Sequence, residues 1–246
     1  MPDINFCITF TTIPPRIKTL KKTIESIEKQ TLKPNKIFLN IPYKYHRFPN
    51  TKILDSDLKN LKSELLEVSR CDDFGPATKI MGSLEKVKKY DCSIIIDDDH
   101  IYDNNFCEIF INAFEKERKN YSFYMQKIFD IEIAQCADGF LIENQNLDLI
   151  EKFYYKYVKN NKNLFLDDDL WISIYLQKIK LSKIENLIEI FRNKTGKYVV
   201  YDIHTSIDAL SEKIHSPKKF LNRRKIAKIE YLKFTVKNYF SNFNQS

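Results

Sequence analysis

Hydrophobic positions in the first part of the chain follow two periods in turn. Short runs of consecutive apolar or β-branched residues, which are typical of buried strands, alternate with stretches in which apolar residues recur every three or four positions, as on one face of a helix. Strands that alternate with helices in this way form a mostly parallel sheet, so the pattern predicts an α/β fold. The predicted strands span residues 4–11, 36–41, 66–69 and 92–96, and the predicted helices span residues 17–30, 57–66 and 77–89.

The pattern is less regular in the second half of the chain, which contains no internal repeat and no linker. We therefore expect a single domain over residues 1–211, followed by a loop and a helical tail over residues 212–246 that packs on this domain or extends from it. The tail is basic, and residues 217–240 have the spacing of an amphipathic helix. Between these regions, the spacing predicts helices over residues 104–119, 147–159 and 168–177 and extended segments over residues 122–128, 131–142 and 197–203.

Composition narrows the class of protein further. The 246 residues are 43% hydrophobic, which is enough for the core of one α/β domain and excludes wholesale disorder. Only 4 residues are glycine, which argues against a β-propeller, and no apolar run is long enough to predict a transmembrane helix. The 5 cysteines are scattered without a C-x-x-C pair, so we expect no disulfide framework or zinc site and a reducing compartment. Because the N-terminus lacks a basic segment before its short apolar run, we expect a first strand rather than a signal peptide, and a cytoplasmic protein.

The net charge is +7, from 40 Lys and Arg residues against 33 Asp and Glu residues. An excess of this sign is compatible with nucleic acid, an anionic membrane or a phosphorylated small molecule as the partner. The positive charge is concentrated towards the C-terminal tail, whereas the segments with recognisable chemistry are rich in aspartate. We therefore expect no nucleic-acid partner, and we interpret the tail as a candidate peripheral contact with the cytoplasmic face of a membrane.

Three adjacent aspartates, Asp97, Asp98 and Asp99, follow an unbroken apolar run directly. In a parallel sheet, ligands bind at the carboxyl ends of the strands, where this strand would deliver the three carboxylates. Because side chains alternate along an extended backbone, Asp97 and Asp99 would point the same way and form a clamp for a hard divalent cation such as Mg²⁺ or Mn²⁺. The alternative is a solvated acidic loop. The motif alone does not separate nucleases, phosphotransferases and glycosyltransferases.

The segment CDDFGPATK precedes the acidic strand, and its Gly-Pro pair predicts a tight turn before a helix. Asp72 or Asp73 could accept a hydrogen bond from an imide or hydroxyl group of a ligand, and Lys79 in the first helical turns could contact a phosphate. The alternative, which the residues support equally, is an Asx-type turn that only caps the helix.

A second acidic cluster, Asp167, Asp168 and Asp169, occurs in LFLDDDLWISIYL at the predicted start of a helix. Carboxylates at such a position can simply cap the helix and complement its dipole. The adjacent Trp171 favours a functional interpretation, because an aromatic wall beside a carboxylate suits a sugar ring and a general base. In ADGFLIE, Gly139 begins a strand and would permit the close approach of a ligand.

In this order along the chain, the segments TTIPPRI, KQTLKP, IFLNIP, DDFGPATK, IIIDDDHIY, ADGF and LDDDLWIS resemble those of GT-A-fold glycosyltransferases, in the broad family-2-like group. The resemblance extends over most of the chain, from Phe6 to Ser211. It implies a Rossmann-like GT-A fold, a nucleotide-sugar donor that is usually UDP-linked, and a divalent metal ion. It also implies an inverting direct displacement when a later acidic pair supplies the base.

The resemblance implies a metal site and a donor site when it is carried over position by position. Asp97 and Asp99 would match the metal-binding D-x-D motif. A late histidine often completes the metal site in such enzymes, and His215, which basic residues follow, is a better candidate here than His204. The residues that would bind the donor are Thr11, Thr12, Pro14, Arg16, Asp72, Asp73, Lys79, Asp98 and Gly139.

The resemblance also implies a catalytic pair and an acceptor side. Asp168 and Asp169 would match the acidic pair, with Asp169 as the general base and Trp171 on the acceptor side. This chain departs from the usual pattern because its pair consists of two aspartates within a triplet that begins at Asp167. The base could therefore be another member of the triplet.

The sequence thus predicts a hexosyltransferase of glycan biosynthesis that uses Mn²⁺ or Mg²⁺ to move a sugar from a UDP-sugar to a hydroxyl of a glycan, lipid or protein. One alternative is a two-metal nuclease or nucleotidyltransferase that uses both aspartate clusters. Another is a binding module whose basic tail holds nucleic acid or a membrane. A glycosyltransferase releases a nucleoside diphosphate from its donor, whereas the first alternative cleaves a phosphodiester or adds a nucleotide.

Overall fold

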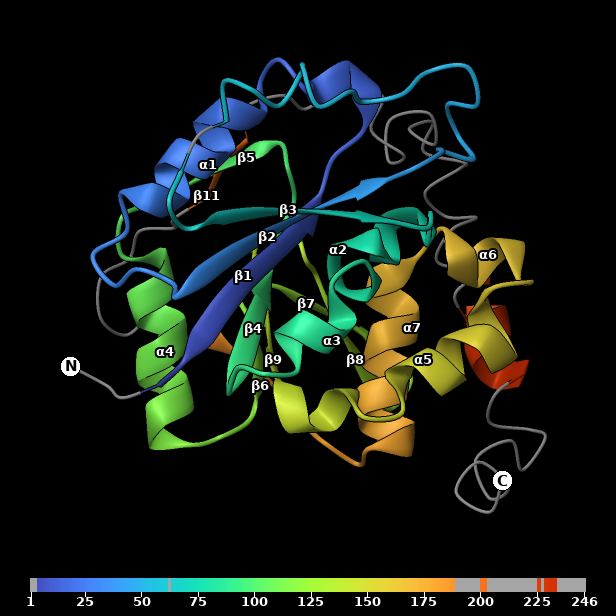
Figure 1. Ribbon diagram of the computed structural model, residues 1–246. Helices are drawn as coiled ribbons and strands as arrows, with labels where there is room; N and C mark the ends of the chain where they lie inside the picture. Colours follow the sequence, from blue (N-terminus) through green and yellow to red (C-terminus); the bar gives the residue numbers. More distant parts are fainter. Residues whose placement is uncertain (1–3, 62, 189–199, 203–224, 227, 234–246) are drawn as a thin grey trace.

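A seven-stranded sheet in the order β10-β6-β9-β4-β1-β2-β3 forms the centre of the molecule (Figure 1). The structure is a computed structural model that describes residues 4–61, 63–188, 200–202, 225–226 and 228–233. β9 runs antiparallel to both of its neighbours, β4 and β6, whereas the other pairs in the sheet are parallel. The mostly parallel α/β fold predicted from the sequence is therefore confirmed. The strands are β1 (Phe6–Thr11), β2 (Lys36–Pro42), β3 (Leu66–Cys71), β4 (Cys92–Ile95), β6 (Asn120–Ser122), β9 (Phe140–Glu143) and β10 (Ile184–Asn186).

Helices cover both faces of this sheet (Figure 1). α1 (Leu20–Glu28) and α4 (Phe106–Lys116) pack on one face, together with alternate residues of the central strands such as Ile8 and Ile94. The opposite face carries a second core, to which the intervening residue Ile95 of β4 belongs. The helices on that face are α2 (Thr78–Met81), α3 (Leu84–Val87), α5 (Ile150–Phe153) and α7 (Asp168–Ile174). Because both faces are covered, β1 and β4 are buried along nearly their whole length and consist mainly of apolar residues, and this is why they were recognisable in the sequence.

Shorter elements connect and flank the strands of this sheet. β5 (His100–Tyr102) pairs antiparallel with β11 (Val200–Asp202), and β7 (Met125–Ile128) forms an antiparallel hairpin with β8 (Ile131–Ala134). The connecting 3₁₀ helices are η1 (Pro14–Arg16), η2 (Gly75–Ala77) and η3 (Asn144–Leu147). The remaining elements are α6 (Lys162–Phe165) and the π-helices η4 (Tyr154–Val158) and η5 (Tyr175–Ile179).

The structure corrects several predicted elements. The predicted helix over residues 57–66 is wrong, because residues 57–60 form successive turns and residue 66 begins β3. The guanidinium of Arg70 fixes the start of these turns, since it donates to the carbonyl of Ile53 at 2.8 Å and lies 2.5 Å from a carboxylate oxygen of Asp55. The predicted helix over residues 77–89 is divided into α2 and α3 at Gly82, where a Cβ atom would lie only 2.7 Å from the Cβ of Asn40.

The second half of the chain also differs in detail from the prediction. The long extended segment predicted over residues 131–142 is two strands, β8 and β9, and the predicted strand at 197–203 is represented by β11. In the predicted C-terminal tail helix, residues 225–226 and 228–233 are helical, and the rest of that prediction lies outside the described residues. Within the described part of the chain, every helix is too short or too polar to span a membrane.

Candidate active site

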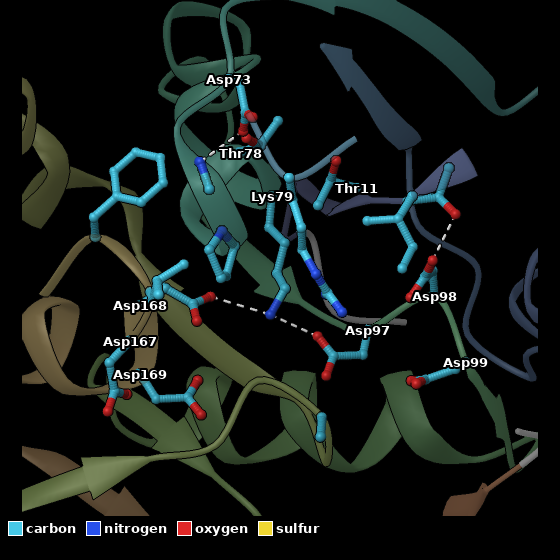
Figure 2. A pocket seen from close by; sticks show the side chains of 18 of the residues that line it. Thr11, Asp73, Thr78, Lys79, Asp97, Asp98, Asp99, Asp167, Asp168 and Asp169 are labelled. Carbon is cyan, nitrogen blue, oxygen red and sulfur yellow. Dashed lines mark hydrogen bonds and ion pairs between the residues drawn. The ribbon is translucent and has the colours of Figure 1, made fainter. Parts of the chain in front are cut away.

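A cavity of about 770 Å³ opens at the carboxyl ends of the parallel strands (Figure 2). Its walls are the segments that follow β1, β2, β3 and β4, together with the start of α7 and the β7–β8 hairpin. Ligands bind at this edge in open α/β sheets, and a volume of this size is typical of a small-molecule site. The cavity therefore collects the two aspartate clusters that the sequence separates by about seventy positions.

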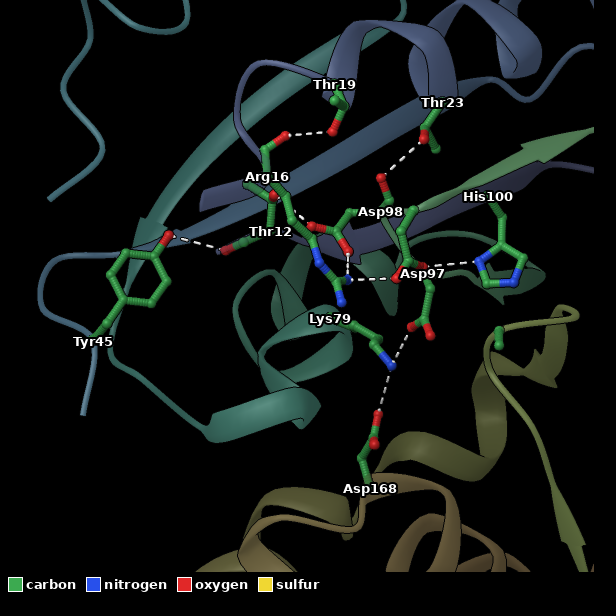
Figure 3. Close-up of polar contacts among 12 residues, drawn as sticks. Thr12, Arg16, Thr19, Thr23, Tyr45, Lys79, Asp97, Asp98, His100 and Asp168 are labelled. Atoms are coloured by element: carbon green, nitrogen blue, oxygen red, sulfur yellow. Dashed lines mark hydrogen bonds and ion pairs between the residues drawn. The ribbon is translucent and has the colours of Figure 1, made fainter. Parts of the chain in front are cut away.

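The segment after β1 is bound to the aspartates after β4 (Figure 3). Arg16 Nη1 lies 2.6 Å from a carboxylate oxygen of Asp98 and 2.8 Å from one of Asp99. The hydroxyl of Thr12 donates to the second oxygen of Asp98 at 2.5 Å. Burial raises the pKa of Asp98 above its usual value, although the nearby guanidinium opposes this shift. Because both oxygens of Asp98 are held by protein donors, this residue fixes the wall of the cavity.

Lys79 on α2 joins the two acidic clusters. Its ammonium lies 2.5 Å from Asp97 Oδ1 and 3.0 Å from Asp168 Oδ2, and Figure 2 shows the two carboxylates on opposite sides of it. Burial acts to lower the pKa of Lys79, but Asp168 and Asp97 outweigh it and raise the pKa well above the usual value. Burial acts to raise the pKa of Asp97, and Lys79 outweighs it so that this pKa is lowered. Lys79 is thus a buried cation shared by two carboxylates.

The three aspartates at the start of α7 have different environments. Asp167 is the N-cap, whose carboxylate accepts a hydrogen bond from the backbone N–H of Leu170, and Asp168 pairs with Lys79. Asp169 lines the cavity and accepts a hydrogen bond at 3.0 Å from the backbone N–H of Cys136. Burial and the neighbouring Asp168 raise the pKa of Asp169 to about 7. A carboxylate with this pKa is suited to take a proton near neutral pH.

Asp73 adopts the Asx-type turn that the sequence left open as an alternative. One carboxylate oxygen accepts the N–H of Gly75 at 2.8 Å, and the other accepts the N–H of His46 at 2.6 Å and lies 3.0 Å from its ring nitrogen. Gly75 has a φ of +64°, and a Cβ atom there would lie 2.7 Å from the carbonyl oxygen of Phe165. Asp73 and Gly75 thereby let α6 approach η2 at the mouth of the cavity.

Four residues expected in the donor or acceptor site do not line the cavity: Pro14, Asp72, Gly139 and Trp171. Trp171 is fully buried and stacks on Phe153 at a centroid distance of 6.2 Å, so it belongs to the core and cannot form an acceptor wall. Gly139 has a φ of +94°, and a Cβ atom there would lie 2.6 Å from the ring of Phe106. Its role is therefore close packing on α4 and not contact with a ligand.

The other expected residues fall into two groups. The cavity is lined by the expected Thr11, Thr12, Arg16, Asp73, Lys79, Asp97, Asp98, Asp99, Asp168 and Asp169. The two histidines considered as metal ligands, His204 and His215, lie outside the described residues.

The cavity also contains residues that the sequence reasoning missed. The loop after β2 contributes Tyr45 and His46, and the β7–β8 hairpin contributes Gln126 and Gln135. The hydroxyl of Tyr45 donates to the carbonyl of Thr12 at 3.0 Å, which ties the loops after β1 and β2 together. The contribution of the loop after β2 could have been predicted, because this loop leaves the sheet at the same edge as the loops after β1 and β4. Nothing comparable in the sequence indicated that the β7–β8 hairpin would line the cavity.

The donor chemistry of Asp97 and Asp99 fits Mg²⁺ or Mn²⁺. Both supply hard carboxylate oxygens to the cavity, and Asp97 is the most exposed of its triplet, with 27% of its side chain accessible. An ion at this position would compete with the contacts that Lys79 and Arg16 make to these carboxylates. Of the described residues, Cys136, Asp168 and Asp169 also bring ligand atoms close together. Burial raises the pKa of the Cys136 thiol well above its usual value, so this thiol stays protonated and is a poor metal ligand.

Comparison with known proteins identifies the fold. No protein-family model matches the sequence, and no curated protein matches it. Among solved structures, residues 1–349 of the S. aureus glycosyltransferase TarS in complex with UDP align with a TM-score of 0.53 and 11% identity, covering 93% of this chain and 66% of that one. A further structure of the same TarS fragment gives a TM-score of 0.55 at 11% identity over the same shares of the two chains. This chain thus spans slightly less than two thirds of the TarS fragment.

A nucleotidyltransferase is as similar in structure as TarS. The 4-diphosphocytidyl-2C-methyl-D-erythritol synthase of Anaerococcus prevotii aligns with a TM-score of 0.50 and 13% identity, covering 93% of this chain and 95% of that one. At these identities the likeness shows the fold alone. The chain therefore has a GT-A-like, Rossmann-related fold, which both glycosyltransferases and nucleotidyltransferases adopt.

Proposed function

We propose that this protein is a metal-dependent glycosyltransferase that moves a sugar from a UDP-sugar to a hydroxyl group of a glycan, lipid or protein. One observation carries the proposal: Asp169, whose pKa is raised to about 7, lines the same cavity as the Asp97–Asp99 cluster. Lys79 connects the two sides of that cavity. A carboxylate pair for a divalent ion and a separate general base are the two parts that transfer from a nucleotide sugar to a hydroxyl requires.

The charge of the cavity supports a diphosphate donor that binds together with a metal ion. Its lining includes the aspartates at positions 73, 97, 98, 99, 167, 168 and 169, but only Arg16, Arg47 and Lys79 as lysine or arginine. A diphosphate alone would be repelled by this excess of negative charge. When bound, Mg²⁺ or Mn²⁺ would neutralise the carboxylates and the negative charge that develops on the departing nucleoside diphosphate. The UDP bound to TarS supports uridine as the nucleoside.

Asp169 is the residue that we assign as general base. It is fixed by the backbone N–H of Cys136, whereas Asp168 is held by Lys79 and Asp167 caps α7. In the proposed reaction, a hydroxyl of the acceptor loses its proton to Asp169 as its oxygen bonds to the anomeric carbon, and the bond from that carbon to the diphosphate breaks. A single displacement of this kind inverts the configuration at the anomeric carbon.

Nucleotidyl transfer is the second candidate function. The synthase from A. prevotii favours it, because the alignment covers 95% of that enzyme. A two-metal version of this chemistry, or of a nuclease, would require both aspartate clusters to bind adjacent ions. Lys79 argues against that arrangement, since its ammonium lies between Asp97 and Asp168, at 2.5 and 3.0 Å.

The two functions release different products, so an assay of the products separates them. The full chain is incubated with a panel of nucleotide sugars, and in parallel with CTP, UTP and a panel of sugar phosphates, each with Mn²⁺, with Mg²⁺ and with a chelator. We expect metal-dependent release of UDP from at least one UDP-sugar and no release of pyrophosphate from the triphosphates. Release of pyrophosphate without release of any nucleoside diphosphate would replace our proposal by nucleotidyl transfer.

Variants make this assay specific to the cavity. Asp97→Asn should abolish the release of UDP, because it removes a carboxylate from the proposed metal site. Asp55→Asn is the matched control, since Asp55 is an exposed aspartate that pairs with Arg70 and lies outside the cavity. If Asp97→Asn keeps full activity with the same metal dependence, the proposed metal site is wrong.

A further inference from the structure

Among the described residues near the C-terminus, one helical segment has a buried face and an exposed face. We call residues 225–226 and 228–233 the C-terminal helix; in Figure 1 they are the red segment close to α6. Glu230 and Tyr231 are each only 2% exposed. The carboxylate of Glu230 accepts hydrogen bonds from the amides of Asn161 and Asn163, at 2.7 and 3.0 Å. The hydroxyl of Tyr231 donates to Asp130, which also pairs with Lys178.

The outer face of the same helix combines apolar and cationic side chains. Ile226, Ile229 and Leu232 are 39%, 44% and 45% exposed, and they follow one another at intervals of three residues. Lys225, Lys228 and Lys233 are also exposed. On a helix, Ile229 and Leu232 lie opposite the buried face that Glu230 and Tyr231 form, and these lysines flank them. The described part of the helix contains one acidic residue, Glu230, and its side chain is on the buried face.

The apolar area of this face extends to the β7–β8 turn. Phe129 at the tip of that turn is 52% exposed, and its ring stacks on the ring of Tyr231 at a centroid distance of 5.8 Å. The ammonium of Lys228 lies 5.8 Å from the centre of the Phe129 ring. Two separate elements therefore present apolar side chains and a lysine on one surface. Exposed apolar residues that gather in a patch are characteristic of interaction surfaces, whereas single exposed residues are ordinary.

We propose that the outer face of the C-terminal helix, together with Phe129, binds an anionic lipid surface. Apolar side chains surrounded by lysines suit such a surface, because the apolar groups enter the boundary of the acyl chains while the long lysine side chains reach the charged headgroups. A protein partner would need acidic groups around an apolar centre, whereas a bilayer with anionic lipids supplies both features over its whole surface.

The C-terminal helix contacts segments that form or adjoin the wall of the candidate active site. Asn161 caps α6, the short helix that precedes Asp167, and the hairpin bound by Tyr231 lines the cavity. A lipid surface would therefore bind next to two of the elements that form the cavity wall. This docking does not depend on the proposed transfer reaction, so the two proposals can fail independently.

Co-sedimentation of the full chain with vesicles tests the proposal. We expect binding to vesicles of phosphatidylcholine and phosphatidylglycerol in equal parts, weak binding to phosphatidylcholine alone, and loss of binding as salt is raised. The double variant Ile229→Glu/Leu232→Glu should reduce the partition coefficient at least tenfold. Leu181→Glu is the matched control, because Leu181 is 82% exposed outside this helix and its replacement should leave binding unchanged.

A second variant tests the contribution of the lysine charges to binding without changing the apolar side chains. Lys225→Gln/Lys228→Gln keeps every apolar side chain, and it should lower binding about 30-fold, since each lysine near an anionic surface contributes roughly a fivefold factor. The proposal is overturned if the wild-type chain does not bind the anionic vesicles, or if it binds neutral vesicles equally well. It is also overturned if both double variants bind as the wild type does, or if Ile229→Glu/Leu232→Glu instead converts a dimer to a monomer, which would make this face an interface between copies.

Discussion

The ammonium of Lys79 lies 3.0 Å from the carboxylate of Asp168, although the two residues are 89 positions apart in the sequence. This contact crosses the cavity from α2 to the first turn of α7, and the same ammonium holds Asp97 after β4. Both side chains of the Lys79–Asp168 pair are about 90% buried, with exposed fractions of 10% and 8%. An ion pair in this environment adds little net stability, because removing the charges from water offsets their attraction, but loss of one partner leaves an uncompensated buried charge.

Lys79→Met should therefore destabilise the protein strongly. We expect a loss of about 3–5 kcal/mol in the free energy of unfolding, the typical cost of breaking one side of a buried pair. Urea unfolding followed by circular dichroism measures it. The matched control is Lys86→Met, because Lys86 and its partner Glu67 are 46% and 38% exposed, and for that variant we expect a loss of less than about 1 kcal/mol.

The double variant Lys79→Met/Asp168→Asn tests whether the Lys79–Asp168 pair is the cause. It removes the ammonium and one of the carboxylates that depend on it, so it should recover part of the lost stability relative to Lys79→Met alone. A double variant that loses the full sum of both single effects would show that the pair is not energetically coupled.

The position of the first aspartate cluster, at the carboxyl edge of the sheet, could be predicted from the sequence. Both β1 and β4 are buried on two faces and therefore have mainly apolar sequences that locate their ends. Once the strands were placed, the carboxyl edge of a parallel sheet determined where Asp97, Asp98 and Asp99 had to lie. The same reasoning could not supply the partner of each carboxylate. Contacts such as that of Lys79 with Asp168 depend on how segments far apart in the sequence pack in three dimensions.

The role of Trp171 could not be predicted for a related reason. In α7 the residues from 170 to 174 are all buried, because the helix packs on the second core and also against β8. The periodicity therefore does not distinguish a residue that faces the cavity from one that faces the core. The helix predicted at residues 57–66 does not form. The apolar residues of this segment have only moderate helical spacing, and contacts of Arg70 with Ile53 and Asp55 hold the preceding residues in turns.

Trp171→Phe should leave the transfer reaction unchanged if Trp171 belongs to the core. The indole Nε1 is buried without a hydrogen-bond partner among the described residues, so phenylalanine removes an unsatisfied donor while it keeps the stacking on Phe153. We expect kcat and KM for the acceptor within about twofold of the wild type. We expect a loss of stability of at most about 1–3 kcal/mol from the smaller volume. A large increase in the KM for the acceptor alone, with unchanged stability, would restore an acceptor-side role for Trp171.

Asp97→Asn should remove the metal-dependent component of nucleotide binding. In a thermal-shift experiment with UDP and Mn²⁺, the wild type should show a higher melting temperature than with UDP and a chelator, because a ligand that binds only the folded state stabilises it by mass action. For Asp97→Asn, we expect the same melting temperature for UDP with Mn²⁺ as for UDP with the chelator. Asp55→Asn should behave as the wild type. An undiminished response to Mn²⁺ in Asp97→Asn would mean that the ion binds elsewhere.

Asp169→Asn should separate catalysis from stability as the pH changes. Burial and Asp168 raise the pKa of Asp169 to about 7, so the wild-type rate should rise with pH and reach half of its maximum near pH 7 as the base ionises. Because the pKa is about 3.8 in the unfolded chain, ionisation of Asp169 should cost the folded state stability progressively between pH 4 and pH 7. Asp169→Asn cannot ionise, so it should lose transfer and retain donor binding, and relative to the wild type it should be more stable at pH 8 than at pH 5. Urea unfolding at both pH values and the rate of UDP release measure the two effects; a variant that still transfers the sugar would show that another group is the base.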